Sequence, residues 1–385
     1  MNRALSIILF IISPLAGVTF SFISFFLKKT NELDYYFFCV LMSLLIGIIN
    51  SGKVLDSDFL NYYDSFINVE NMTFIEYIYS MNKEPFFFLY NYIAYYLFFG
   101  NFDIYIVATT TIGYTFMCHA LIRCHSLLKS SNVYLFIAIF ILFLFPNIFS
   151  LSAHLIRQFL AMSILLILTV EFVFYAKNKY SYFISSMLIH TSSVIFGLIY
   201  IIKITNGARF KLYIAIVITF LIITIFIKFP LILGNLSFNN VFLDYGITRL
   251  QNIDKQFVDL ESLNISSYIM FIFIVVIFYI FWKEYSINIK NSYILFFISI
   301  VLLFFIAINH GNTEISLRFS FYFYSLLPLS IYLFLSLVDI KIVRLYPLMS
   351  FSIIFLFLLP WFLYKLLNGA WVYNNISRIY FIGFW

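Results

Sequence analysis

Charged residues are scarce in this chain of 385 residues: only 10% are Asp, Glu, Lys or Arg, whereas 63% are hydrophobic. A soluble core does not bury so much apolar surface, so this composition excludes a soluble globular protein. Apolar runs recur throughout, and their length of about 20 residues is that of a membrane-spanning helix. We therefore predict an all-α integral membrane protein, a single polytopic bundle of about 10–12 helices covering residues 1–385.

Cysteine is also rare, and the motifs of several enzyme classes are missing. The three cysteines, Cys39, Cys118 and Cys124, lie in or beside apolar runs and show neither metal-ligand spacing nor a disulfide framework. The sequence has no glycine-rich phosphate loop, Walker sequence, zinc motif or nucleophile elbow. These absences exclude the enzyme types that such motifs mark.

Neither a basic patch nor a signal peptide is present. The net charge is +6, but Lys and Arg are scattered at the ends of apolar runs, as membrane topology requires, so a nucleic-acid partner is excluded. The first 27 residues lack the short apolar core and small-residue cleavage site of a signal peptide. They therefore indicate a retained span.

What the sequence does contain is a series of apolar spans. Ten are predicted, at Ala4–Leu27, Tyr35–Ile49, Ile104–Ile122, Val133–Phe149, Gln158–Tyr175, Leu212–Leu233, Tyr268–Trp282, Tyr293–Ile308, Phe319–Val338 and Tyr346–Leu366.

Two further apolar segments do not fit a simple crossing. Phe86–Phe99 is too short to cross, which favours a re-entrant or interfacial helix. Tyr182–Ile202 is long enough but has basic residues on both sides, which predicts that both of its ends are cytoplasmic. Two half-helices meeting near His190 satisfy that pattern, because broken helices are tolerated where they line a cavity.

The distribution of charge predicts which side each loop faces. Basic residues mark the inner loops: Lys28, Lys29, Arg123, Lys129, Lys177, Lys179, Lys203, Arg209, Lys211, Lys283, Lys290, Lys341 and Arg344. Three outer, periplasmic segments follow, at residues 51–103, 235–267 and 309–318, and the first of them is acidic and rich in tyrosine. Both termini are then expected on the outer side.

Arg157 and His154 lie at the start of a strongly apolar helix, and Arg318 lies at the start of another. An ionisable residue at the membrane edge is costly unless it faces protein or a cavity, so each is a candidate for function. Arg157 and His154 are one helical turn apart and would share a face. The planar guanidinium suits phosphate or pyrophosphate. The alternative is that each arginine reaches the lipid headgroups or pairs with a carboxylate.

His190 is the only ionisable residue in its apolar segment. An imidazole can act as a general base or donate a hydrogen bond to an anion. The alternative is a neutral buried histidine bonded to a neighbouring serine, Ser192 or Ser193.

The acidic segment contains the remaining candidates. Asp58 and Tyr62 would share a helical face that suits recognition of a sugar hydroxyl together with stacking on the ring, unless the segment is a solvated loop. Glu84 precedes Pro85 and an apolar run, which is also ordinary helix-start chemistry. His310 and Glu314 are weaker candidates in the last outer segment.

At these residues the chain resembles the EpsG-like family of Wzy-type polysaccharide polymerases. The pieces that carry the resemblance are DSDFLNYYDSF, NKEPFFFLYNYI, HLIRQFLAMSIL, SSMLIHTSSVIF and SLRFSFYFYSLLP, in the order of the family. They cover about residues 35–335, and the most specific are the RQ-x-x-A and I-H-[ST]-S pieces.

The resemblance implies a GT-C-like glycosyltransferase of the bacterial inner membrane. It would join undecaprenyl-pyrophosphate-linked oligosaccharide repeat units, donor and acceptor, on the periplasmic face. Arg157 and Arg318 would bind the leaving pyrophosphate in place of a metal ion, so no catalytic metal and no cofactor are expected. His190 would contact the acceptor hydroxyl or the pyrophosphate, with Asp58 and Glu84 as alternative bases. The expected sugar contacts are Tyr62, His154, Gln158, His310 and Glu314.

Besides the bilayer, a chain-length regulator and a flippase would be candidate partners. Three rival functions stay open. An O-antigen ligase has similar architecture and chemistry. A lipid-linked oligosaccharide flippase or other transporter needs charge in a cavity but no chemistry, although the sequence has no internal repeat. A membrane acyltransferase would need an acid–histidine motif on the cytoplasmic side, and none is evident.

Overall fold

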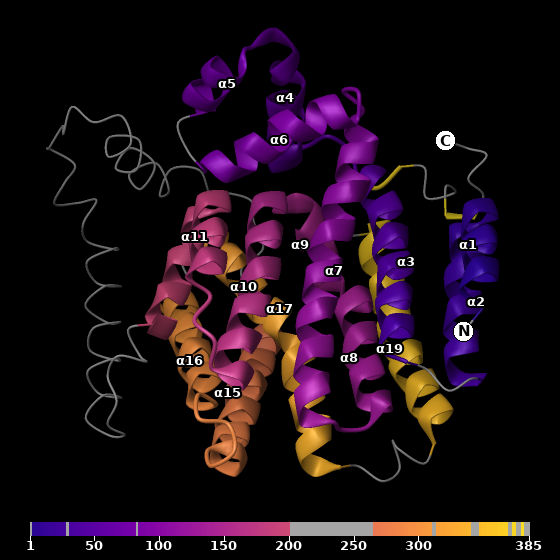
Figure 1. Cartoon of the computed structure of the whole chain (residues 1–385), viewed down its shortest axis with the longest axis vertical. Helices are drawn as coiled ribbons and strands as arrows, with labels where there is room; N and C mark the ends of the chain where they lie inside the picture. The colour runs from indigo at the N-terminus through magenta and orange to yellow at the C-terminus, as the bar shows by residue number, and fades with distance from the viewer. Residues whose placement is uncertain are drawn as a thin grey trace, which may run out of the picture.

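The computed structural model describes residues 2–27, 31–81, 84–200, 265–309, 313–339, 346–368, 372–374 and 379–380. These residues form helices, and apart from an isolated β-bridge between Lys53 and Tyr373 no β structure occurs within those ranges. Figure 1 shows a bundle of roughly parallel long helices, with shorter helices gathered above one end. The predicted all-α class is therefore confirmed.

The N-terminal span is not a single crossing. α1 (Arg3–Ile12) and α2 (Pro14–Leu27) pack against each other, and the break falls at Ser13, which is extended, before Pro14. The Arg3 guanidinium lies 2.9 Å from the Asp34 carboxylate at the start of α3 (Glu32–Ser51). The chain thus returns to the level at which it began. The predicted single span Ala4–Leu27 is therefore wrong. That span would have placed Arg3 on the outer side, opposite to the start of α3, whereas Arg3 lies beside the start of α3.

The centre of the bundle is formed by α3, α7 (Phe102–Leu128) and α10 (Ile156–Tyr175). α3 and α7 approach closely because Gly47 has no side chain: a Cβ there would lie 2.8 Å from the carbonyl oxygen of Val107. α10 is the most enclosed of the described long helices, which agrees with its continuous apolar sequence.

A proline divides the next predicted span. α8 (Asn132–Leu144) and α9 (Pro146–His154) meet at a bend of 50°, so Val133–Phe149 is not one straight helix. A second break at Leu155 separates α9 from α10. The prediction that His154 and Arg157 share one face of a continuous helix is therefore wrong, although both lie at the same junction.

The segment around His190 forms the hairpin predicted from its flanking charges. α11 (Tyr180–Ile189) ends at His190, and the 3₁₀ helix η2 (Thr191–Gly197) begins directly after it. The rings of Tyr180 and Tyr200 stack with centroids 4.6 Å apart, so the chain comes back to the level at which it entered. His190 lies at the tip. The membrane side on which the hairpin opens stays a prediction.

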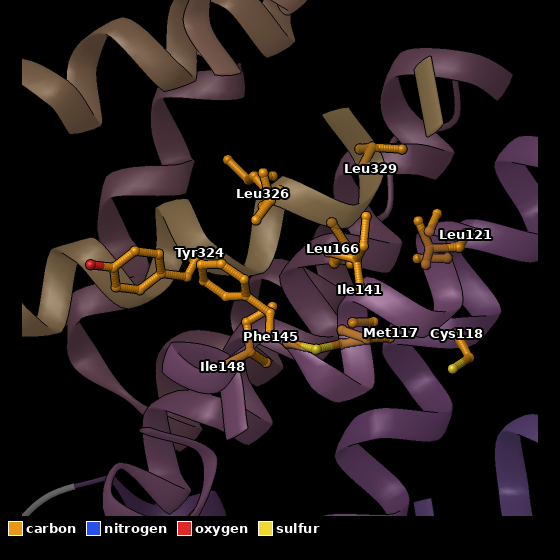
Figure 2. Close-up of a cluster of buried hydrophobic side chains, with 14 of the residues drawn as sticks. Met117, Cys118, Leu121, Ile141, Phe145, Ile148, Leu166, Tyr324, Leu326 and Leu329 are labelled. Carbon is orange, nitrogen blue, oxygen red and sulfur yellow. The ribbon is translucent and has the colours of Figure 1, made fainter. Parts of the chain in front are cut away.

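The C-terminal part completes the bundle with α15 (Ile265–Tyr285), α16 (Tyr293–Ile308), α17 (Thr313–Val338) and α19 (Pro347–Asn368). α17 packs against α8, α9, α10, α15 and α16. Figure 2 shows how buried side chains from α7, α8, α9, α10 and α17 meet in one cluster. Segments from both halves of the sequence thus share one apolar core.

The first acidic segment folds as a helical cap, made of α4 (Ser57–Ile67), the 3₁₀ helix η1 (Asn68–Asn71), α5 (Phe74–Met81) and α6 (Pro85–Leu97). Its buried aromatic residues form a second core, which includes Phe59, Phe66 and Tyr77. The solvated-loop alternative is therefore wrong. In Figure 1 α6 lies across the ends of the long helices, as an interfacial helix would.

Five described helices, α3, α7, α10, α15 and α17, are long and apolar enough to cross a membrane, and the bent pair α8–α9 raises the number to six. The chain is thus a multi-pass membrane protein. The predicted span Leu212–Leu233 and nearly all of the outer segment 235–267 lie outside the described residues.

Candidate functional site

The candidate site lies between the cap and the bundle. Four parts of the chain meet there: the cap, the start of α10, the tip of the α11–η2 hairpin and the first turns of α17. Each contributes charged or polar side chains that the sequence predicted: Asp58, Tyr62, Glu84, Arg157, Gln158, His190 and Arg318. Residues far apart in the sequence are therefore brought together in one place.

Glu84 is at the centre of this cluster. It occupies the N-cap position of α6, but its carboxylate makes no cap hydrogen bond and turns inward instead. One carboxylate oxygen accepts a hydrogen bond from Nη1 of Arg157, and the other lies 2.6 Å from Nδ1 of His190. The backbone N–H of Thr191 also donates to Glu84, at 3.4 Å. One buried carboxylate thus links the cap, α10 and the hairpin tip.

The backbone of Glu84 is in a conformation that residues other than glycine rarely adopt, with φ of 48° and ψ of 58°. Such positions persist where the surrounding contacts fix them, and they cluster at functional sites. Here the three contacts of the carboxylate supply that constraint. The helix-start explanation of Glu84 therefore accounts for its position in the sequence but not for the inward orientation of its carboxylate.

Glu84 stays ionised. Burial on its own raises the pKa of this carboxyl, but the charge of Arg157 and the hydrogen bond from His190 outweigh burial and hold the pKa below its usual range. A carboxylate with a lowered pKa, and with both oxygens engaged, is a weak proton acceptor. The geometry therefore disfavours Glu84 as the general base and favours it as the partner that orients His190.

Arg157 is enclosed, with 8% of the residue exposed. Its guanidinium lies over the rings of Tyr62 and Phe87, at 5.4 and 5.9 Å from their centroids. Nη1 donates to Glu84, yet Nε has no hydrogen-bond partner within the part of the chain that the structure describes. A buried donor without an acceptor is costly, and an anion oxygen would satisfy it.

Arg318 forms the more open ion pair of the site. Its Nη2 lies 3.5 Å from the Asp58 carboxylate, and the two side chains are 17% and 30% exposed. The backbone carbonyl of Arg318 accepts a hydrogen bond from Nε2 of Gln158. Gln158 thus fixes the start of α17 against α10, directly beside Arg157.

His190 contacts Glu84 through one of its two ring nitrogens. Nδ1 donates its proton to the ionised Glu84, so in the neutral ring Nε2 is the proton acceptor. A carboxylate on one ring nitrogen and a proton-accepting second nitrogen form the arrangement of an oriented general base. The alternative of a histidine bonded only to a neighbouring serine does not describe this contact.

The remaining predicted residues are less central. Tyr62 is buried beneath Arg157, and burial, the largest of several effects, raises the pKa of its hydroxyl above the usual value. His154 is buried at the end of α9, close enough to interact electrostatically with Asp58 and Arg318. Glu314 lies in the first turn of α17, and His310 is outside the described residues.

Lys53 and Tyr322 also lie near this site but were not predicted from the sequence, and Ser192 was considered only as a partner of His190. The Lys53 ammonium is buried, pairs with Asp56 and lies 4.7 Å from the centroid of the Phe59 ring, which fixes the start of α4. The Ser192 hydroxyl lies 2.5 Å from the Tyr322 hydroxyl. Of these, only Tyr322 had a usable signal, because it follows Arg318 by one helical turn.

A second ionic cluster lies near the far ends of α7 and α10, away from the cap. Arg123 Nε donates to Glu171 at 2.9 Å, and its guanidinium lies 4.1 Å from the centroid of the Tyr175 ring.

No group of three or more His, Cys, Asp or Glu residues with the geometry of a metal site occurs among the described residues.

The fold and the site define a class: a multi-pass membrane protein with a helical cap over a buried Arg–Glu–His cluster. The sequence model of the EpsG family matches residues 34–375, and the chain therefore belongs to the EpsG family. Membership makes it a membrane protein related to polysaccharide biosynthesis. Comparison with curated proteins and with solved structures finds no match.

Proposed function

We propose that this protein is a Wzy-type surface-polysaccharide polymerase of GT-C-like architecture. It joins undecaprenyl-pyrophosphate-linked repeat units on the periplasmic face of the bacterial inner membrane. The observation that carries the proposal is the buried Arg157, whose Nε lacks an acceptor while Nη1 is held by Glu84. The Nε–H of Arg157 suits a phosphate oxygen, and Arg318 supplies a second guanidinium at the outer edge of the site.

The reaction is a glycosyl transfer. The hydroxyl oxygen of the acceptor attacks the anomeric carbon of the donor sugar, and the bond between that carbon and the pyrophosphate oxygen breaks. Its electron pair leaves with undecaprenyl pyrophosphate. The hydroxyl proton moves to Nε2 of His190, while Glu84 stabilises the imidazolium through Nδ1. Arg157 and Arg318 stabilise the charge that develops on the leaving group.

Asp58 remains the alternative base, because it is the more exposed carboxylate of the site. That Tyr62, His154, Gln158, His310 and Glu314 contact the sugar stays a prediction. So do the absence of a catalytic metal and the partnership with a chain-length regulator and a flippase.

Deletion of this chain in its source cells tests the proposal. Lipid-linked single repeat units should then accumulate on the outer face, and the wild-type chain should restore long polysaccharide. A ligase defect would instead leave long polymers on undecaprenyl pyrophosphate. A flippase defect would trap the repeat units on the cytoplasmic face. Either of these two outcomes would contradict the proposal.

A further inference from the structure

The tip of the α11–η2 hairpin is held at a second point, which the proposed chemistry does not use. The hydroxyls of Ser192 and Tyr322 lie 2.5 Å apart. Tyr322 is fully buried in α17, and its ring also contacts Phe196 of η2, with centroids 5.4 Å apart. Glu84 thus ties the hairpin to the cap, and Tyr322 ties it to α17.

Tyr322 belongs to the same neighbourhood as the charged residues. It follows Arg318 by four residues, so the two share one face of α17. The charges of Glu84 and Arg318 both act on the Tyr322 hydroxyl. On the hairpin side, the backbone N–H of Ser193 donates to the carbonyl of His190 at 3.1 Å. His190 and Ser192 therefore lie within one tight turn.

Building on the proposed function, we propose that Tyr322 is a positioning residue for His190. Its hydroxyl holds Ser192, and the turn between them fixes the ring of His190, so that Nε2 stays at the acceptor hydroxyl. Tyr322 acts only through this turn. A displacement of about 1 Å of a catalytic group is enough to lower the rate by roughly 10²-fold, so a single hydrogen bond at the hairpin tip has a measurable effect.

The same helix offers a matched control. Tyr332 is also fully buried in α17, and its hydroxyl lies 2.7 Å from the hydroxyl of a serine, Ser130. It contacts His125 as well, at 3.1 Å, near the end of α7 that lies away from the cap. Tyr332→Phe thus removes an equivalent hydroxyl from the same helix without touching the candidate site.

The test uses the full chain in proteoliposomes, with lipid-linked repeat units extracted from source cells that lack it. Tyr322→Phe should lower kcat by roughly 10- to 100-fold and leave KM nearly unchanged. Ser192→Ala, at a partly exposed position, should have the same effect, and the double variant should be no slower than either single one. Tyr332→Phe should keep the wild-type kcat.

The outcomes separate the two proposals. If the wild type makes polymer and kcat is unchanged in Tyr322→Phe and Ser192→Ala, the positioning role alone is overturned. An equal loss of kcat in Tyr332→Phe would also overturn it, because the effect would then be one of general stability. Absence of polymer from the wild type would overturn the proposed function and this inference together.

Discussion

Arg157 carries a permanent charge in a nearly closed site, and lysine cannot reproduce its two-pronged geometry. Arg157→Lys keeps the positive charge next to Glu84 but removes the Nε–H and the planar fork. We expect a loss of about 2.7–4 kcal/mol of transition-state stabilisation, a factor of 10² to 10³ in rate. The measurement is polysaccharide chain length in cells at equal protein abundance.

Arg123 is the matched control, because it also pairs with a buried glutamate, Glu171, but at the far end of the bundle. Arg123→Lys should leave the chain length unchanged. If both variants shorten the chains equally, the effect comes from the fold. If Arg157→Lys leaves the chain length unchanged, Arg157 does not bind pyrophosphate.

Glu84 makes the stability of the fold depend on pH. The contacts with Arg157 and His190 lower its pKa in the folded state from 4.5, so its contribution is present above about pH 4.5 and is lost as the pH falls. Glu84→Gln removes one partner of a buried ion pair, which costs on the order of 3 kcal/mol at pH 7. In detergent, the Tm of this variant should fall less than the Tm of the wild type when the pH is lowered below 4.5. Parallel curves would show that Glu84 does not carry this pH dependence.

At the scale of elements, the prolines show what a sequence pattern leaves undecided. Pro14 begins the second arm of a helical hairpin, and Pro146 follows a bend of 50°. Pro328 and Pro360 lie inside the continuous helices α17 and α19. A proline removes one backbone donor, but neighbouring helices decide whether the chain turns, bends or continues. Apolar periodicity therefore predicted the continuous helices through Pro328 and Pro360, but not the turn at Pro14 or the bend at Pro146.

The α11–η2 hairpin was predictable from the basic residues on both sides of the segment. Basic residues on both sides required its two ends to lie at one level, and the Tyr180–Tyr200 stack agrees. Cysteines placed at Tyr180 and Tyr200 should therefore be joined by a short bifunctional thiol reagent. One continuous helix would place these positions about 30 Å apart. No cross-link in a folded double-cysteine variant would contradict the hairpin.

No local sequence pattern indicates which residues of the site contact each other. Glu84 is 73 residues from Arg157 and 106 from His190 in sequence. Each residue was identified by itself as an ionisable group in or beside an apolar run. Their mutual contacts depend on how the cap packs against the bundle. The sequence therefore indicated the members of the site, and the alternative that each arginine pairs with a carboxylate is confirmed. It did not indicate that the partners are Glu84 for Arg157 and Asp58 for Arg318, nor the contact of Tyr322 with Ser192.

In the molecule as a whole, acidic residues are concentrated in the cap, although Glu171 lies beside Arg123 at the other end. The cap carries Asp56, Asp58, Asp64, Glu70, Glu76 and Glu84, whereas Arg123 and Lys177 lie at the other end. From the positive-inside rule we expect the cap to lie outside the cytoplasm. A cysteine at Asp64 should react with a membrane-impermeant thiol reagent in intact spheroplasts, and one at Lys129 should react only after lysis. The reverse pattern would overturn this orientation.

The proposed function requires that this chain itself joins lipid-linked repeat units. Its most direct test is to incubate the purified protein in proteoliposomes with lipid-linked repeat units extracted from source cells that lack it. The lipid-bound saccharides are then separated by length. We predict a ladder of increasing length, with one undecaprenyl pyrophosphate released for each bond formed, and no ladder with Arg157→Lys over the same time. Repeat units that stay single with the folded wild-type protein would contradict the proposed function.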